Sequence, residues 1–225
     1  MKKWFFFLLS VTLMALQSNA QSKILKGSGK VVKKSFTVQE STDLIIQDFD
    51  GKIFINLSEK PSLSVSMDDN IIDRFSVEQT KSGALRIYLE GNENGRLYLE
   101  KTNISITIGM PSCKKIEYRG NADMDVKGLK NESFELLHTG NGDATFEGKT
   151  RSLKINHVGN GDINARKLES SICDVKSVGN GDIAISAEIS LKANGVGNGD
   201  IILVGPAKIE SLSGMIGNGD LRREK

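Results

Sequence analysis

A four-residue pattern that returns at near-constant spacing limits what this chain can fold into more than any other feature. The pattern is Gly-Asn-Gly-Asp, and its first copy carries Ala as the third residue. Its copies begin at Gly120, Gly140, Gly159, Gly179, Gly197 and Gly217. The spacings between them are 20, 19, 20, 18 and 20 residues. A period of this length indicates a repeat protein in which each period is one structural unit.

Apolar residues alternate around each copy with the period of a β-strand rather than of a helix. The Asn-Gly pair suits the positive φ angles of a tight turn. Two all-β architectures fit: an antiparallel meander, and a parallel β-helix-like solenoid of ~20-residue coils that lie ~4.8 Å apart. In a meander, successive turns would alternate between the two ends of the sheet. The constant register therefore favours the solenoid, in which stacked Asn side chains can hydrogen-bond as a ladder.

The chain is expected to divide into three parts. Residues 1–20 indicate a signal peptide, because two lysines precede an apolar run of 13 residues at Trp4–Leu16, and small residues precede the expected cut. The run is too short for a bilayer core of ~30 Å, although an uncleaved anchor is an alternative. Residues 21–110 are an irregular all-β half, either opening coils or a cap, and residues 111–225 are the repeat solenoid. We expect no transmembrane segment in the mature chain.

The charge of the chain is nearly balanced, with 30 Lys and Arg residues against 28 Asp and Glu residues. The expected signal peptide carries two of the lysines and no acid, so the remainder is formally neutral. A nucleic-acid-binding protein needs an electropositive face. We therefore expect no nucleic-acid partner.

Several segments resemble a bacterial family, the one described as putative auto-transporter adhesin, head GIN domain. They are Phe36–Val38, Leu44–Ile46, Ser64–Ile72, Ile104–Ile108, Met110–Pro111 and Lys114–Ile116, which runs into the first Gly-Asn turn. The repeated Gly-Asn-Gly-Asp turn is the most specific element of the likeness, which covers roughly residues 30–220. The resemblance implies a right-handed, β-helix-like, all-β fold and a place in the cell envelope of Bacteroidota-type bacteria. It brings no catalytic residues.

The candidate site residues form two columns at the turns. The Asn column is Asn121, Asn141, Asn160, Asn180, Asn198 and Asn218. The Asp column is Asp123, Asp143, Asp162, Asp182, Asp200 and Asp220. Stacked carboxylates ~5 Å apart repel each other by ~0.8 kcal/mol in water. Either each Asp caps its own turn by accepting backbone N–H bonds, which we favour, or the column is a calcium ladder. We expect no cofactor other than this candidate calcium.

A candidate binding stripe stands directly before the turn glycines of the last four coils. It consists of Val158, Val178, Val196 and Ile216. Strict alternation from the core positions places these side chains outside, where a larger apolar stripe suggests an interaction site. A strand that twists at the corner would bury them instead. His138 and His157 lie one position further from the turn and take the opposite facing in each case.

The histidines and cysteines are each open to two interpretations. His138 and His157 stack on adjacent coils, either as packed and hydrogen-bonded core residues, which we favour, or as ligands of a metal whose other ligands are unknown. Cys113 and Cys173 lie 60 residues, or about three coils, apart. That separation of ~14 Å exceeds the ~7 Å that a disulfide spans. We therefore expect two free thiols, with Cys173 in the core.

These features predict a non-catalytic, exported cell-envelope protein, an adhesin or binding module that acts through the solenoid surface. Its ligand, a glycan, a protein or a lipid, is not identified by the sequence, nor is its location among periplasm, outer surface and secreted pool. The alternative is an envelope structural or lipid-binding protein. A β-helical enzyme acting on polysaccharides is disfavoured, because its acids would cluster at one site and here they recur equally in every coil.

Overall fold

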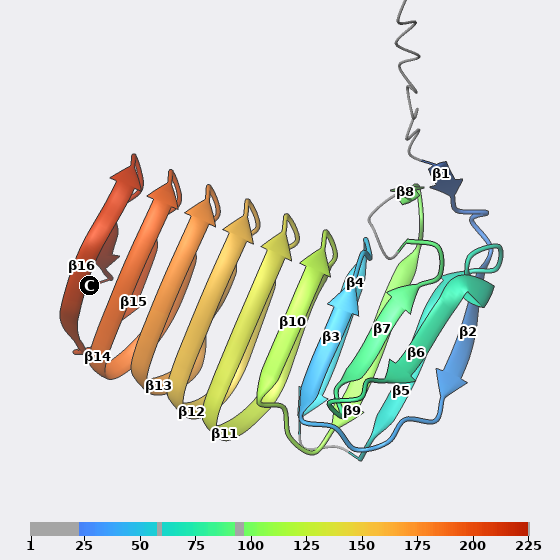
Figure 1. Cartoon of the computed structure of the whole chain (residues 1–225), viewed down its shortest axis with the longest axis horizontal. Helices are drawn as coiled ribbons and strands as arrows, with labels where there is room; N and C mark the ends of the chain where they lie inside the picture. Colours follow the sequence, from blue (N-terminus) through green and yellow to red (C-terminus); the bar gives the residue numbers. More distant parts are fainter. Residues whose placement is uncertain (1–22, 58–59, 93–96, 225) are drawn as a thin grey trace, which may run out of the picture.

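The computed structural model describes residues 23–57, 60–92 and 97–224, and the expected signal peptide at residues 1–20 lies outside them. Strands dominate the described chain, whose helical content is one short 3-10 turn, η1 (Ile72–Arg74). The strands form a β-solenoid whose coils stack along the long axis of the molecule (Figure 1). The all-β solenoid that the repeat predicts is therefore confirmed.

The strands fall into an irregular group and a repeated group. The strands before the repeats are β1 (Lys23–Lys26), β2 (Val31–Phe36), β3 (Asp43–Gln47), β4 (Lys52–Leu57), β5 (Ser62–Asp68), β6 (Phe75–Gln79), β7 (Leu85–Leu89), β8 (Leu97–Glu100) and β9 (Ile104–Met110). The strands of the repeats are β10 (Lys115–Gly120), β11 (Asp123–Gly140), β12 (Ala144–Gly159), β13 (Ile163–Gly179), β14 (Ile183–Gly197), β15 (Ile201–Val204), β16 (Lys208–Gly217) and β17 (Leu221–Arg223).

Each of the long strands β11 to β14 is a whole coil. It begins after a Gly-Asn turn, bends at the opposite edge of the solenoid and returns to the next turn (Figure 1). We call the strand portions that lead into the turns the first sheet, and the portions that follow the turns the second sheet. Neighbouring coils pair in parallel, and Gly140 pairs with Gly159 as Gly159 does with Gly179. This register excludes the antiparallel meander.

The first half of the chain supplies both opening coils and a cap. β3 extends the first sheet beside β10, and β4 extends the second sheet beside β11, both in parallel. The next strands outward are β7 and β9, although they follow β3 and β4 in sequence. The sheets end in antiparallel strands, β6 on the first and β5 with β2 on the second. A domain division at residue 110 stays a prediction, because one hydrophobic cluster runs through both halves.

The core lies between the two sheets, because alternate side chains of every coil point inward. In β12, for example, Phe146, Leu153 and Ile155 are each buried, whereas Lys154 between two of them is exposed. Aromatic side chains also fill the interior, where the rings of Phe134 and Phe146 lie 5.6 Å apart, measured between their centroids. The core positions assigned from the alternation are therefore confirmed in the long coils.

Close stacking at the turns requires glycine. Gly159 has a φ of 151°, and a Cβ added to it would lie 1.8 Å from the carbonyl oxygen of Gly140. The second glycine of the turn is equally confined, since a Cβ on Gly161 would lie 2.1 Å from the carbonyl oxygen of Gly142. Ala122 is tolerated at this place in the first copy, where the preceding coil turns through Asp48–Gly51 instead of a Gly-Asn-Gly-Asp sequence.

We expect Gly159→Ala to lower the free energy of unfolding by more than ~3 kcal/mol, because it adds a backbone clash to the strain of a positive φ. Gly83→Ala is the matched control: Gly83 has a φ of 85°, but its Cβ would meet nothing within 4 Å. We expect the control to cost about 1 kcal/mol. Urea unfolding measures both, and equal losses would show that stacking does not constrain the turn.

Candidate functional site: the turn ladder and the apolar stripe

The Asn column forms a continuous hydrogen-bond ladder along one edge of the solenoid. The amide Nδ2 of each Asn donates to the Oδ1 of the Asn one coil earlier, over 2.8, 2.7, 2.6, 2.6 and 2.8 Å. The backbone follows the same pattern, since Asn180 N–H donates to the Gly159 carbonyl and Asn198 N–H to the Gly179 carbonyl, each over 3.1 Å. The ladder expected from the sequence is therefore present.

The Asp column also links neighbouring coils, in a way that differs from the expected cap. The carboxylate of Asp143 accepts a hydrogen bond from the backbone N–H of Asp162, one coil further on, over 2.8 Å, and the same bond recurs at every step. The expectation was a bond within the turn of each Asp itself. Because each carboxylate but the last, Asp220, lies beside an N–H donor, the repulsion between neighbouring carboxylates is partly offset.

The last pair of this column shows the electrostatic effect of these bonds. The backbone N–H of Asp220 and the guanidinium of Arg222 hold the pKa of Asp200 below its usual value. The Nε of Arg222 lies 2.9 Å from Oδ2 of Asp200. Among the described residues, no group of three or more His, Cys, Asp or Glu side chains is arranged to hold a metal ion. The arrangement is that of a structural ladder, and calcium binding by the Asp column stays an untested alternative.

The apolar stripe faces solvent. Val158, Val178 and Val196 are 50, 49 and 48% exposed, and Ile216 is 66% exposed. The alternation of the strands therefore continues to the turn glycine without a twist. The stripe lies on β12, β13, β14 and β16 of the first sheet, immediately beside the turn ladder.

A row of alternating charge runs along the same sheet, four residues before Val158, Val178 and Val196 of the stripe. Paired neighbours along this row are Asp43, Lys115, Glu135, Lys154, Asp174 and Lys192. The Nζ of Lys154 lies 2.8 Å from a carboxylate oxygen of Glu135, and that contact raises the pKa of the lysine. This row was not predicted, although the charges alternate in sign at the repeat period in the sequence.

The side chains of His138 and His157 point into the solenoid, whereas those of the stripe point outward. Both are 1% exposed, and their Nδ1 atoms lie 3.0 Å apart, so one nitrogen donates to the other. The ring of Tyr118 continues the stack, 5.1 Å from His138 between centroids. The Nε2 atoms of both histidines are buried without a hydrogen-bond partner. The interpretation as packed, hydrogen-bonded core residues fits this geometry.

Burial makes both imidazoles neutral. Desolvation lowers the pKa of each ring, and for His138 the charge that His157 would carry lowers it further. The carboxylates of Asp143 and Asp162 and the carbonyls of Gly142 and Gly159 favour the charged forms, but burial is the largest cause. The pair is consequently sensitive to acid.

The two cysteines are free and buried, as expected. Burial raises the pKa of Cys113 to about 12 and that of Cys173 to about 11. A thiol of this kind is scarcely ionised near neutral pH and is a poor nucleophile or metal ligand. Both cysteines are therefore structural, and Cys173 lies in the core of β13 as predicted.

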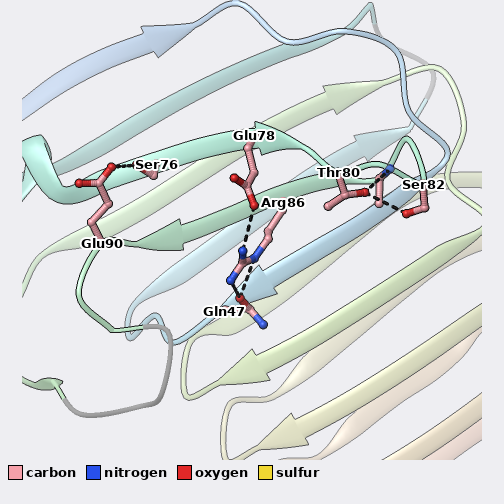
Figure 2. Close-up of polar contacts among 8 residues, drawn as sticks. Gln47, Ser76, Glu78, Thr80, Ser82, Arg86 and Glu90 are labelled. Carbon is pink, nitrogen blue, oxygen red and sulfur yellow. Dashed lines mark hydrogen bonds and ion pairs between the residues drawn. The ribbon is translucent and has the colours of Figure 1, made fainter.

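A cluster of polar contacts joins the capping strands at the start of the first sheet (Figure 2). The guanidinium of Arg86 on β7 lies 2.9 Å from the carboxylate of Glu78 on β6 and donates to the side-chain oxygen of Gln47 on β3 over 2.9 and 2.8 Å. The same guanidinium lies 4.4 Å from the ring centroid of Tyr88. Ser76 on β6 donates a hydrogen bond to Glu90, which directly follows β7. These contacts fasten three strands and leave Arg86 occupied.

Comparison with known proteins identifies a family and a fold. Residues 45–207 match the family model described as putative auto-transporter adhesin, head GIN domain, and no curated protein matches the chain. A putative adhesin from Bacteroides fragilis has a similar solved structure, with a TM-score of 0.67, 23% identity and coverage of 89% of this chain and 100% of that chain. A putative lipid binding protein from Parabacteroides distasonis has a TM-score of 0.55 and 18% identity over 90% of this chain and 100% of that chain.

A putative adhesin from Parabacteroides merdae is similar to the same degree, with a TM-score of 0.54 and 16% identity over 90% of this chain and 100% of that chain. At these identities the likeness shows the solenoid fold and nothing of its ligand. No helix within the described residues has the length and apolar character needed to cross a bilayer.

We expect the melting temperature of the chain to be the same in EDTA and in millimolar Ca²⁺, because five of the six Asp carboxylates are already engaged by a backbone N–H of the next coil. A ligand of the folded state at ~100 times its Kd adds ~2.7 kcal/mol of stability. A calcium-dependent rise of that size in a thermal melt would instead make the Asp column an ion ladder.

We expect acid to destabilise the chain through the histidine pair. The folded-state pKa of each histidine lies below the ordinary value of 6.5, so below that pH the unfolded chain binds more protons and stability falls as the pH falls. Each neutral histidine contributes up to ~1.4 kcal/mol per pH unit.

The double variant His138→Gln/His157→Gln isolates this effect from that of the carboxylates, which it leaves unchanged. Urea unfolding between about pH 6 and pH 5 should show the wild-type chain losing about 1–3 kcal/mol per pH unit more than the variant. The variant is expected to be less stable at every pH, so the slope is the readout. Parallel profiles would mean that the pair is not neutral in the folded chain.

Proposed function

This chain belongs to the family described as putative auto-transporter adhesin, head GIN domain, and on that premise we propose that it is an exported, non-catalytic adhesin of the cell envelope. In this role the chain binds a protein partner through the first sheet of the solenoid. The observation that carries it is the apolar stripe of Val158, Val178, Val196 and Ile216, which is about half exposed or more on four successive coils.

The surroundings of the stripe suit a protein surface. At ~4.8 Å per coil the stripe is ~14 Å long, and it is one side chain wide. The row of alternating charge runs parallel to it on the same sheet. Between the stripe and these charges lies the outward polar row of Asn156, Lys176 and Asn194. A narrow apolar strip flanked by polar groups matches the pattern of a protein interface, in which an apolar centre is surrounded by polar groups.

A non-catalytic role is supported by how the acidic residues of the turns are used. Each Asp of the column occupies the same place in its own coil, and all but the last, Asp220, accept a hydrogen bond from the next coil through their carboxylates. A catalytic acid would differ in environment from its neighbours. The Asp column therefore stabilises the fold and offers no singular group for acid–base chemistry.

A lipid is the second candidate ligand, because the stripe is apolar and a structural neighbour is named as a lipid binding protein. The space between the sheets is filled by side chains such as Phe134 and Phe146, which are 2 and 1% exposed. A lipid would therefore lie along the stripe on the outside.

Replacing the stripe tests the proposal. The variant Val158→Thr/Val178→Thr/Val196→Thr/Ile216→Thr retains β-branched side chains and makes the surface polar, and surface changes of this kind alter stability by about 0.5 kcal/mol or less each. The control Ile172→Thr/Ile189→Thr removes exposed apolar side chains outside the stripe, 39 and 62% exposed. Binding to immobilised fibronectin, fibrinogen and mucin is measured by biolayer interferometry, with phosphatidylglycerol vesicles as the lipid probe.

We expect the wild-type chain to bind at least one of the protein probes and the stripe variant to bind it more than tenfold more weakly. Losing about four methyl-sized contacts of ~0.8 kcal/mol each amounts to ~3 kcal/mol, or more than a hundredfold in Kd at full burial. The control variant should bind within twofold of the wild type. Binding of vesicles alone, abolished in the stripe variant, would support the lipid candidate, and a stripe variant that binds proteins normally would refute the proposal.

A further inference from the structure

The outer surface of the second sheet carries a trough that runs along the axis of the solenoid. Its central hollow has a volume of about 340 Å³ and lies over β4, β11 and β12. A hollow of about 410 Å³ adjoins it on the cap side and shares Lys52 with it. A third, of about 280 Å³, adjoins it on the other side and shares Asp143 and Thr145. We call these three adjoining hollows the trough; each has a volume near or above the small end of ligand sites, ~300 Å³.

The central hollow lies over an outward row of side chains that differ from coil to coil. Phe54, Asp125 and Thr145 are cross-strand neighbours in one outward row across β4, β11 and β12. The same row continues on the next coils with Asn164, Ala184 and Ile202. The phenyl ring of Phe54 is 37% exposed. A large aromatic ring and a carboxylate thus stand side by side in this row.

Asp125 has an oxygen that the protein does not satisfy. Its Oδ2 lies 3.1 Å from the ammonium of Lys127, whereas its Oδ1 is buried and has no hydrogen-bond partner. An acceptor left unpaired in a buried place costs free energy. Within the described residues, the ammonium of Lys52 and the hydroxyl of Thr145 also have no hydrogen-bond or ion-pair partner. The central hollow therefore presents the exposed part of a carboxylate, two further polar groups and an aromatic ring.

The charges of the central hollow are largely compensated by neighbours. The carboxylate of Glu147 lies 3.1 Å from the ammonium of Lys167, and that of Asp125 is paired with Lys127. The carboxylates of Asp123 and Asp143 accept backbone hydrogen bonds. An anionic ligand would be repelled by these acids, and a cationic one by Lys52 and Lys127. An uncharged ligand rich in hydroxyl groups meets neither penalty, since each hydroxyl both donates and accepts.

We propose that the trough binds a linear, uncharged glycan. A sugar hydroxyl donates to the exposed part of the Asp125 carboxylate, whose side chain is 30% exposed, others accept from Lys52 and Thr145, and the apolar face of a ring packs on Phe54. Neighbouring rings of the chain extend into the adjoining hollows. This site lies on the sheet opposite the apolar stripe, so the inference goes beyond the protein-binding function proposed above and does not rest on it.

The test measures binding of soluble polysaccharides to the immobilised full chain by biolayer interferometry. Dextran, mannan and xyloglucan are the neutral probes, and polygalacturonate and glycol chitosan are the charged ones. Phe54→Ala removes the ring, Phe54→Tyr retains it, and Asp125→Asn removes the carboxylate. The matched controls are Tyr98→Ala, an aromatic residue 62% exposed on β8, and Asp174→Asn, a carboxylate on the first sheet.

We expect at least one neutral polysaccharide to bind, with Phe54→Ala and Asp125→Asn each weakening it at least fivefold. Phe54→Tyr and both control variants should bind within twofold of the wild type. The fourfold stripe variant should also retain glycan binding, so failure of the protein-binding proposal leaves this result readable. Thermal melts confirm that each variant is folded.

Three outcomes would overturn the proposal. The first is that no neutral polysaccharide binds, or that a charged one binds more tightly than all of them. The second is that the Phe54→Ala and Asp125→Asn variants bind as the wild type does. The third is that the stripe variant loses the glycan, which would place the sugar on the first sheet.

Discussion

The close approach of successive backbones at the turns is the constraint on which the rest of the structure depends. Gly140 and Gly159 are in contact, with no room for a Cβ between them. Every coil must therefore begin at the same edge of the solenoid and in the same register. The Asn and Asp ladders then form because identical side chains are brought to the same place ~4.8 Å apart. The polar groups at this edge are satisfied by the next coil rather than by water alone, which rigidifies the edge of the solenoid.

Because the register is fixed, residues at equivalent positions of successive repeats form a row along the solenoid, and the members of several rows share a chemical character. Inward rows are mostly apolar and include one buried histidine pair, whereas the outward rows of the first sheet include a charged row and the apolar stripe. Alternating signs place opposite charges beside each other at consecutive coils, as Lys154 lies beside Glu135. Such exposed pairs contribute little stability individually.

The features that recur in every repeat could be predicted from the sequence, whereas the features that occur only once could not. The parallel coils, the Asn ladder, the core columns and the free cysteines all follow from a constraint repeated every ~20 residues. The placing of β7 and β9 outside β3 and β4 could not be predicted, because apolar strands of similar length can pair in many orders. The facing of the stripe depended on whether the strand twists at the corner. The trough joins Phe54 to Asp125, residues 71 positions apart that share no motif.

The order of strands in the cap has a consequence for how the molecule is made. Every strand that precedes β10 in the two sheets lies within residues 31–110, so the surface on which β10 and β11 pair is complete before the repeats are synthesised. Each later coil pairs with the one just made. The cap can therefore act as a template from which the solenoid grows one coil at a time, in the direction of synthesis. A chain truncated after any full coil would keep its earlier coils and expose a new growing edge.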